Sequence, residues 1–481
     1  MALIGAVALP LLAALLCWIP PLRRAAWIIS VVCLGSAFAL SLVVAAEVIS
    51  HSRVIGIPRW LEADGLSALV LVLVSFVTAL AAIFARDYMR HDEEQSHRIW
   101  WFYCDSNLFA FALIVTPALA DPNLVWVGVE LITLFAILLV AFERTPSALE
   151  AAWKYSMLTM IGAPISLLGF LVLFWAYRSA GATSPETWTS LASQASAMPP
   201  ALLKLAFLLV FVGFGAKVGL APMHTWLPDA HSQAPSPACA VLSGVKTSVP
   251  LYAILRLLGI LLGAPAISIG RWMTVIGLLS VAVAAFLLLQ VREYKRMFAY
   301  STVEHMGIIL TGAGLATHSS DFGAVSQMLN HSITKSLCFY VAGTVLVTLE
   351  TREIKSVRGL LRASPFMGGA LLLCALAIAG APPFPIFLSE YSILSAGLRD
   401  GHTLVVAILS ALIVLAFIGI LLQVNRMAFG RAERPLVRVN VPNSCRIAII
   451  AACVPVVIFG IYIPGPLHSL LLLAAQQLGG H

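Results

Sequence analysis

Charged residues are scarce in this sequence. They make up 11% of its 481 positions, whereas hydrophobic residues make up 60% and the mean hydropathy is +0.96. Soluble domains carry about 25% charged residues, and no stretch of this chain is polar enough to form one. The net charge of +7 does not indicate a nucleic-acid partner, because membrane proteins collect Lys and Arg in their cytoplasmic loops. The composition excludes a soluble protein and indicates an integral membrane protein.

Patterns that hold cofactors or metals are also missing. The eight cysteines contain no Cys-x-x-Cys pair and most lie in apolar runs, where Cys acts as a small hydrophobe. The chain has no phosphate loop, no haem or cluster ligand pattern and no nicotinamide fingerprint. His224 and His231 have only Asp229 between them and match no standard zinc spacing. We therefore expect no cofactor and no metal site, and we leave open whether the chain is itself part of an enzyme.

Apolar runs of about 20 residues recur along the chain, each long enough to cross a hydrocarbon core of about 30 Å. We predict an all-α integral membrane fold of about 14 transmembrane helices, which form a single membrane domain over residues 1–481. The first run lacks a preceding basic region and a cleavage site, so we interpret it as a retained span. The predicted spans are 2–20, 25–48, 63–85, 100–120, 122–142, 151–177, 201–223, 236–262, 268–290, 297–317, 321–348, 365–396, 402–425 and 446–475.

The basic residues alternate between the loops that join these spans. The odd-numbered loops hold 19 Lys and Arg residues, and the even-numbered loops with the adjoining helix ends hold 6. Cytoplasmic loops are the richer ones in membrane proteins. This bias predicts that both termini lie on the outer face, and it favours an even number of spans.

Five charged residues fall well inside predicted spans. A charge at the centre of a membrane helix costs about 2.5–3.5 kcal/mol, so such residues are usually functional. Burial disfavours the charged form of a lysine, which lets a buried lysine release and recapture a proton. An alternating series of acids and bases can therefore pass protons from site to site. The five residues are Glu130, Lys217, Lys246, Lys335 and Glu390.

Further titratable residues accompany these five. Imidazole has an unperturbed pKa of about 6.5 and can hand a proton in either direction. A single intramembrane His or Lys is a structural residue about as often as a functional one, but the whole set favours a proton relay. Its remaining members are His224, Asp229, His231, Glu304, His305 and His331.

Two of the spans are broken by glycine and proline, one beside Lys217 and one before Glu390. Broken membrane helices are tolerated where they line a cavity or are buried in protein. A shift of five spans relates the two breaks, and an odd shift reverses the direction of travel through the membrane. We therefore predict two inverted five-helix repeats, over about 100–262 and about 268–425, which would meet at an ion path near the midplane.

Four motifs resemble those of one membrane superfamily. They are Gly213–Pro237, which reads GFGAKVGLAPMHTWLPDAHSQAPSP, with Glu150–Tyr155, Tyr294–Gly307 and Pro382–Glu390. The first is similar to the hallmark of the antiporter-like proton-pumping subunits of complex I, multisubunit cation/proton antiporters and membrane-bound hydrogenases. The resemblance covers essentially spans two to thirteen, and the motifs are most similar to the hydrogenase-4 component F branch.

The resemblance implies a proton-translocating subunit of a redox-driven complex, of the membrane-bound [NiFe] hydrogenase or formate hydrogenlyase type. It implies other membrane subunits and a peripheral hydrogenase-like iron–sulfur module as partners, with protons, or else sodium, as the transported ion, lipids around it and no nucleic acid. The implied location is the inner cell membrane of a bacterium or archaeon. A sodium/proton antiporter subunit, a subunit of a complex I-like NADH dehydrogenase and a non-pumping scaffold remain the alternatives.

The same resemblance assigns pathway roles to Glu130, Lys217, Lys335 and Glu390. The chain departs from the family at span eight, where the usual base falls nearer Ser248 and Lys246 lies two residues earlier. Two residues correspond to about 200° on a regular helix. Lys246 can therefore replace the family's base only if this span is locally rearranged, which Pro250 would permit, and we expect it to face inward.

Overall fold

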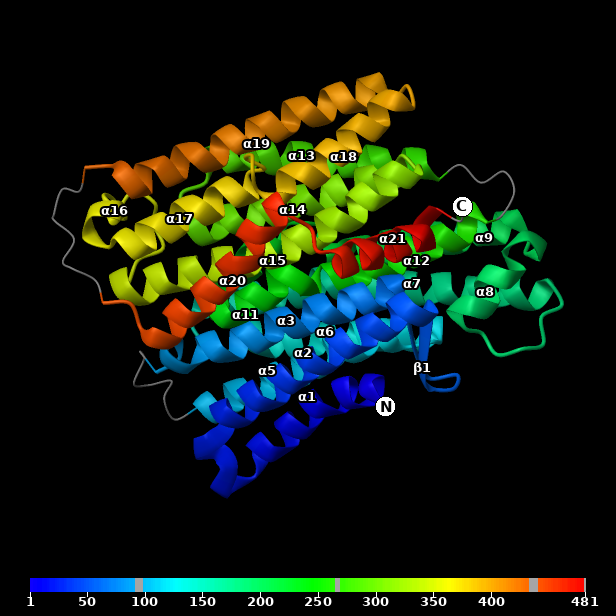
Figure 1. The fold of residues 1–481 in the computed structure, drawn as a ribbon, viewed down its shortest axis with the longest axis horizontal. Coiled ribbons are helices and arrows are strands. Elements are labelled where there is room, and N and C mark those ends of the chain that lie inside the picture. The colour runs from blue at the N-terminus through cyan, green and yellow to red at the C-terminus, as the bar shows by residue number, and fades with distance from the viewer. Residues whose placement is uncertain (91–97, 264–268, 432–439, 480–481) are drawn as a thin grey trace.

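The computed structural model describes residues 1–90, 98–263, 269–431 and 440–479. Most helices run side by side along the longest axis of the molecule, with α1 (Ala2–Trp18) at one edge and α19 (Thr403–Phe429) at the other (Figure 1). The other helices are α2 (Ala26–His51), α3 (Gly65–Tyr88), α5 (Ile99–Ala118), α6 (Pro122–Val140), α7 (Pro146–Ser179), α8 (Trp188–Gln194), α9 (Pro200–Val218), α10 (Trp226–Gln233), α11 (Ser236–Val241), α12 (Ser248–Leu262), α13 (Gly270–Gln290), α14 (Tyr294–Gly314), α15 (His318–Leu349), α16 (Leu360–Ala363), α17 (Pro365–Ile378), α18 (Pro385–Arg399), α20 (Asn443–Ile461) and α21 (Gly465–Gly479).

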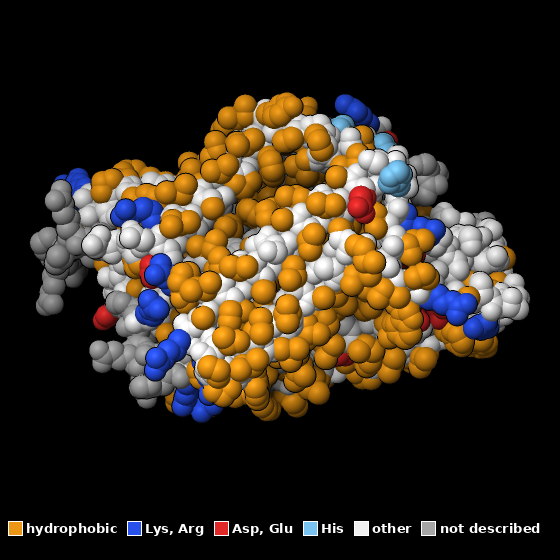
Figure 2. Space-filling view, turned by 60° about the horizontal axis from the view of Figure 1, so that its bottom comes forward, with side chains coloured by type: hydrophobic (Ala, Val, Ile, Leu, Met, Phe, Trp, Pro, Cys, Tyr) orange, Lys and Arg blue, Asp and Glu red, His pale blue; other side chains and the backbone are white. Residues whose placement is uncertain are grey.

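This is a multi-pass helical membrane protein. Within the described ranges, eleven helices or joined helices are long and apolar enough to cross a membrane, and α1 and α17 are shorter apolar helices. Figure 2 shows hydrophobic side chains covering the middle of one face, with Lys and Arg gathered toward the two ends. All fourteen predicted segments contain helix. The count of fourteen crossings and the inverted repeats stay predictions.

The two breaks predicted from the sequence are present. The first lies between α9 and α10, and the second between α17 and α18. Each begins with a glycine in the left-handed region, Gly219 with φ 85° and Gly380 with φ 75°, a conformation that other residues adopt only under strain. The helices α12 and α15, at the centre of the bundle, are buried on nearly all sides.

The last predicted span, 446–475, is wrong as a single helix. Instead α20 ends at Ile461, and α21 follows after Tyr462, Ile463 and Pro464. Proline lacks the backbone N–H that helix continuation requires, and Pro464 and Pro466 both stand at this junction. The 15 residues of α21 pack against α3, α12 and α15.

Two small elements at one end of the bundle have no counterpart in the predicted spans. The strands β1 (Arg53–Ile57) and β2 (Leu61–Asp64) form an antiparallel hairpin, and α8 lies near them. Both chain ends lie at this end of the molecule (Figure 1). Two of the arginines that support the predicted orientation, Arg434 and Arg438, fall outside the described residues.

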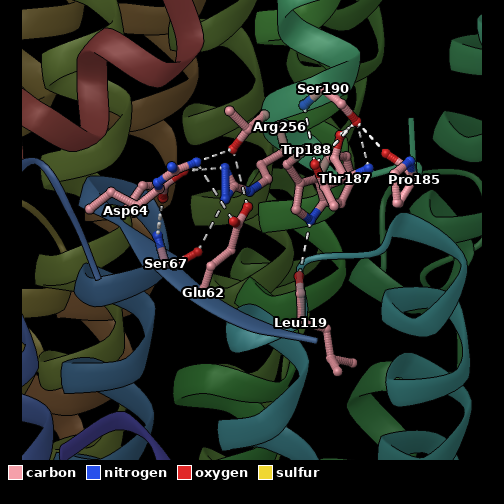
Figure 3. A network of polar contacts seen from close by, with 11 residues as sticks. Glu62, Asp64, Ser67, Leu119, Pro185, Thr187, Trp188, Ser190 and Arg256 are labelled. Atoms are coloured by element: carbon pink, nitrogen blue, oxygen red, sulfur yellow. Dashed lines mark hydrogen bonds and ion pairs between the residues drawn. The ribbon is translucent and has the colours of Figure 1, made fainter. Parts of the chain in front are cut away.

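A polar network fastens this end of the bundle (Figure 3). The buried guanidinium of Arg256, on α12, forms an ion pair with Asp64 and donates from Nε to the Tyr252 hydroxyl at 2.8 Å. Asp64 also accepts from the backbone N–H of Ser67 at 3.0 Å and so caps α3. Trp188, on α8, lies beside Arg256 and donates from Nε1 to the Leu119 carbonyl at 3.2 Å. One arginine therefore links α3, α8 and α12.

Candidate functional site

The first buried pair lies at the end of α9, directly before the break. Lys217 Nζ is 3.0 Å from Glu130 Oε2 and 2.9 Å from Thr133 Oγ1, both on α6. Lys217 is fully buried, whereas 24% of the Glu130 side chain is exposed. Lys217 and Glu130, two members of the series predicted from the sequence, therefore form a close ion pair. Its cause is the cost of burying either charge without a partner.

Lys246 lies inside the protein and not at the lipid boundary. Residues Leu242–Lys246 form a π-helical turn between α11 and α12. Pro250 has no N–H to bond the Lys246 carbonyl four residues earlier, which favours such a rearrangement. The amine of Lys246 donates to the Lys217 carbonyl at 2.9 Å and lies 4.0 Å from the centre of the Trp226 ring. The hydroxyl of Ser248 contacts its own helix, at the Gly244 carbonyl.

His231 lies between the two halves of the chain. Its imidazole is fully buried and packs edge-on against Trp226 and Phe339. It interacts electrostatically with Lys246, Lys335 and Lys295. Neither ring nitrogen has a hydrogen-bond partner within the described residues. Buried polar atoms without protein partners are the usual binding sites of ordered water.

Lys335 and His331 share one face of α15, as their spacing of four residues predicts. The Lys335 amine, fully buried, donates to the Ser301 hydroxyl and to the Phe298 carbonyl on α14. His331 Nε2 lies 3.1 Å from the carbonyl oxygen of Ser243, a residue of the π-helical turn that carries Lys246. The turn therefore contacts both halves of the chain.

From His331 a run of polar contacts continues to the second break. The centres of the His331 and His305 rings lie 5.3 Å apart. His305 Nδ1 is 2.7 Å from the Gln327 side-chain nitrogen, and the Ser389 hydroxyl donates to the Gln327 side-chain oxygen. Ser389 immediately precedes Glu390 on α18. Neutral side chains thus connect the histidines with the terminal acid.

Glu390 is 5% exposed and faces the interior at the break between α17 and α18. Its carboxylate lies directly against Gly380, where a Cβ atom would overlap it. Glu304, which is also buried, interacts electrostatically with both Lys335 and Glu390. We call the residues that the structure brings together the interior series: Glu130, Lys217, Lys246, His231, Lys335, His331, His305, Glu304 and Glu390.

Two of the predicted site residues do not join this series. Asp229 forms ion pairs with Lys154 at 3.2 Å and Arg296 at 2.9 Å, near the starts of α7 and α14. His224 is half-buried in the first break, and its Nδ1 has no hydrogen-bond partner within the described residues. Asp229 stabilises the junction of α7, α10 and α14, and His224 has no contact with the interior series among those recorded.

Sequence reasoning missed several members of the site. Lys295 is one of the 19 Lys and Arg residues that the sequence analysis assigns to the odd-numbered loops, because Arg292 and Arg296 flank it. It is instead fully buried, and its amine donates to the Ala234 carbonyl at 2.8 Å. Gln327 and Ser389 carry no charge, so burying them does not have the large free-energy cost that singled out the charged residues in the sequence. The only signal was the presence of polar residues inside apolar helices, since Thr133, Ser243, Ser301, Gln327, Asn330 and Ser389 are all buried.

Comparison with known proteins assigns the chain to a family. Residues 121–416 match the family model described as NADH:quinone oxidoreductase/Mrp antiporter, TM, and residues 55–98 match one described as the N-terminus of complex I chain 5. The chain belongs to this family of antiporter-like membrane proteins. All nine residues of the interior series lie within residues 121–416.

Individual relatives agree with this assignment. A hydrogenase-4 component F homolog of Methylacidiphilum infernorum is 34% identical over 414 residues, which cover 83% of this chain and 85% of that protein. A chain of the archaeal membrane-bound sulfane sulfur reductase has the same fold, with a TM-score of 0.88, 23% identity and coverage of 99% and 98%. A chain of the Mrp complex from Dietzia sp. matches with a TM-score of 0.86, 19% identity and coverage of 99% and 97%. Such relatives are subunits of larger membrane complexes, which supports other membrane subunits as partners.

Proposed function

We propose that this family member moves protons across the membrane as one subunit of a redox-driven complex. The observation that carries the proposal is the interior series, in which titratable side chains lie in succession from Glu130, beside the first break, to Glu390, beside the second. Intramembrane ionisable residues that pair with one another usually mark ion pathways. The energy for pumping would come from redox chemistry in partner subunits.

The first half of the series supplies a way to move a proton by electrostatics. Glu130 stabilises a positive charge on Lys217, while the Lys246 amine lies against the backbone of the same residue. Two ammonium groups so close in a buried site repel each other. If Glu130 moves away from Lys217, the proton on Lys217 is less stable there and transfer toward Lys246 becomes favourable.

The second half would carry the proton from Lys335 through His331 and His305 to Glu390. Backbone carbonyls cannot release protons, so the Ser243 carbonyl positions His331 and does not itself transfer a proton. A hydrogen-bonded water can bridge two polar groups almost as well as direct contact. We therefore place water-mediated transfer around His231, whose ring nitrogens have no hydrogen-bond partner within the described residues and whose imidazole interacts electrostatically with both Lys246 and Lys335.

The chemistry of the series favours protons over sodium. Lysine and histidine are proton carriers that repel a cation when charged, and the Glu130 carboxylate already interacts with Lys217. The inward position of Lys246 also weakens the scaffold alternative, which rested on a displaced base. The two glycine-started breaks support the proposed repeats over about 100–262 and about 268–425.

The 34% identity to a hydrogenase-4 component F homolog supports a complex of the membrane-bound [NiFe] hydrogenase or formate hydrogenlyase type. Its peripheral hydrogenase-like iron–sulfur module would be the redox partner. The excess of Lys and Arg in the odd-numbered loops supports an orientation with both termini outside, and we propose that the membrane is the inner cell membrane.

The test is purification of the tagged chain with its complex from native membranes, followed by reconstitution in vesicles. We expect a hydrogenase-like subunit to co-purify and expect redox turnover to change the internal pH equally with and without sodium. Transport that requires sodium would refute the proton assignment. Co-purification with only antiporter subunits would refute the redox coupling.

A further inference from the structure

A large pocket opens at the end of the molecule opposite the β hairpin, well away from the interior series. It has a volume of about 610 Å³ and lies where α1 turns into α2, beside the end of α3 and the start of α5. We call it the arginine pocket, because four of its nine lining residues are arginines. The lining residues are Arg23, Arg24, Ala26, Trp27, Arg86, Arg90, Ile99, Trp100 and Tyr103.

Among the described residues, the positive charge of this pocket is not balanced by acidic side chains in its walls, since none of the lining residues is acidic. Within the same part of the chain, Asp87 forms an ion pair with one of these arginines, and its carboxylate is 3.9 Å from Arg86 Nε, beyond hydrogen-bond distance. Asp87 instead accepts from the backbone N–H of Ser444 at 2.9 Å and so binds the start of α20. The arginine pocket therefore has several cationic donors available for an anion.

Two of the arginines are held in a binding geometry. The guanidinium of Arg23 lies 3.7 Å from the centre of the Trp100 ring, and that of Arg86 lies 4.4 Å from the centre of the Trp27 ring. Stacking of this kind orients the flat group and leaves N–H edges for phosphate, and Arg23 Nη2 also donates to the Trp18 carbonyl at 3.4 Å. The Nε atoms of Arg23 and Arg86 are buried and have no hydrogen-bond partner within the described residues.

Neighbouring tryptophans place the pocket at the membrane surface. Trp18 packs on Trp101 with ring centres 4.9 Å apart, and Trp101 stacks on Trp100 at 4.7 Å. Trp18 and Trp101 remain 52% and 39% exposed. Exposed tryptophans of membrane proteins gather at the level of the lipid head groups. An anion that reaches the arginine pocket is therefore most readily supplied by the bilayer.

We propose that the arginine pocket binds the phosphate head group of an anionic phospholipid. The proposal rests on the positive charge and volume of the pocket and on its position at the level of the lipid head groups. It does not depend on proton translocation by the chain. Basic pockets between membrane helices are a known means of binding such head groups. Bound lipid would tie together α1, α2, α3 and α5 on this side of the bundle.

The test uses the full-length chain in neutral detergent, titrated with phosphatidylglycerol or with phosphatidylcholine while thermal unfolding is followed. We expect phosphatidylglycerol alone to raise the Tm in a saturable manner. The R23Q/R86Q variant should need about 25-fold more phosphatidylglycerol for half of the effect, at about five-fold per arginine. The matched control R292Q/R362Q removes two exposed arginines that line no part of this pocket and should shift the titration by less than about two-fold.

Three results would overturn the proposal. One is a titration of R23Q/R86Q that matches R292Q/R362Q. Another is stabilisation of the lipid-free chain by pyrophosphate as strongly as by phosphatidylglycerol, which would assign the pocket to a soluble phosphate compound. The third is a wild type that does not respond to phosphatidylglycerol, which would leave the pocket to a neighbouring subunit. If R23Q/R86Q does not fold, the exposed Arg24 provides the single variant R24Q, with an expected change of about five-fold.

Discussion

The amine of Lys246 donates a hydrogen bond to the backbone carbonyl of Lys217, at 2.9 Å. This contact joins the first break to the π-helical turn, and the same turn reaches His331 through the Ser243 carbonyl. Lys246, two residues before the position that the resemblance gives to the family's base, thus contacts the first half directly, and its turn contacts the second half. The rearranged helix explains how the chain tolerates the displacement.

Replacement of Lys246 by Met should lower proton translocation by at least about ten-fold while expression stays near normal, because Met fits an apolar site. Proton uptake by reconstituted vesicles measures the effect. If both lysines belong to one continuous path, the loss of either one interrupts proton transfer. The double variant K217M/K246M should therefore be no slower than the slower single variant. Losses that multiply in the double variant would show that the two lysines act independently.

Gly380→Ala should reduce translocation about as strongly as Glu390→Gln. A methyl group at Gly380 would strain a backbone with φ 75° and overlap the Glu390 carboxylate. Gly369→Ala, on α17 just before the break, is the matched control, because a Cβ atom there meets nothing within 4 Å. The measurement is the rate of proton translocation by G380A, E390Q and G369A in reconstituted vesicles. A G380A variant that pumps like G369A would contradict the assigned position of Glu390.

Arg256→Gln should destabilise the protein by about 3 kcal/mol, because it leaves the largely buried Asp64 without its partner. Thermal unfolding of the purified chain measures this loss. Arg271→Gln is the control, since Arg271 is exposed at the start of α13. Equal Tm values for the two variants would show that the network of Figure 3 contributes little.

Stability should also depend on Glu186, which lies outside the spans, between α7 and α8. Burial raises the pKa of Glu186 from 4.5 to about 7, although Asn123 donates to its carboxylate at 3.1 Å. Between these two pH values the folded chain binds more protons at this group than the unfolded chain, so its contribution to stability falls as pH rises.

Glu186→Gln removes this dependence. Relative to wild type, the variant should be no more stable near pH 4 and more stable above pH 7, by up to about 3 kcal/mol. Unfolding midpoints measured from pH 4 to pH 8 give the difference. Glu353→Gln, at an exposed carboxylate, serves as control. A constant difference between E186Q and wild type across this range would refute the raised pKa.

The charged part of the site could be predicted from the sequence because burial of charge is costly and therefore marks function. The contact between Glu130 and Lys217 follows from that cost, and Gly219 and Gly380 marked both breaks. Asp229 was grouped with the relay because it is close to His231 in sequence, yet its partners Lys154 and Arg296 come from other helices. Such long-range pairs have no local sequence signal.

The neutral part of the site could not be predicted. Gln327 and Ser389 are neutral residues in apolar helices, and the free-energy cost of burying them is too small to predict a functional role. Their contact depends on how α15 packs against α18. Lys295 was misassigned because its neighbours in sequence are loop arginines, whereas the start of α14 directs it inward. Tertiary packing decided each of these cases.

The most direct test of the central claim compares two lysines on one helix. Lys217 and Lys204 both belong to α9, but Lys217 is buried against Glu130 and Lys204 is exposed. Proton uptake should be measured in vesicles that contain the complex with K217M or with K204M, at matched subunit content. The account predicts that K217M lowers uptake by at least about ten-fold and that K204M retains at least about half of it. Normal uptake by K217M would contradict a proton path through the interior series.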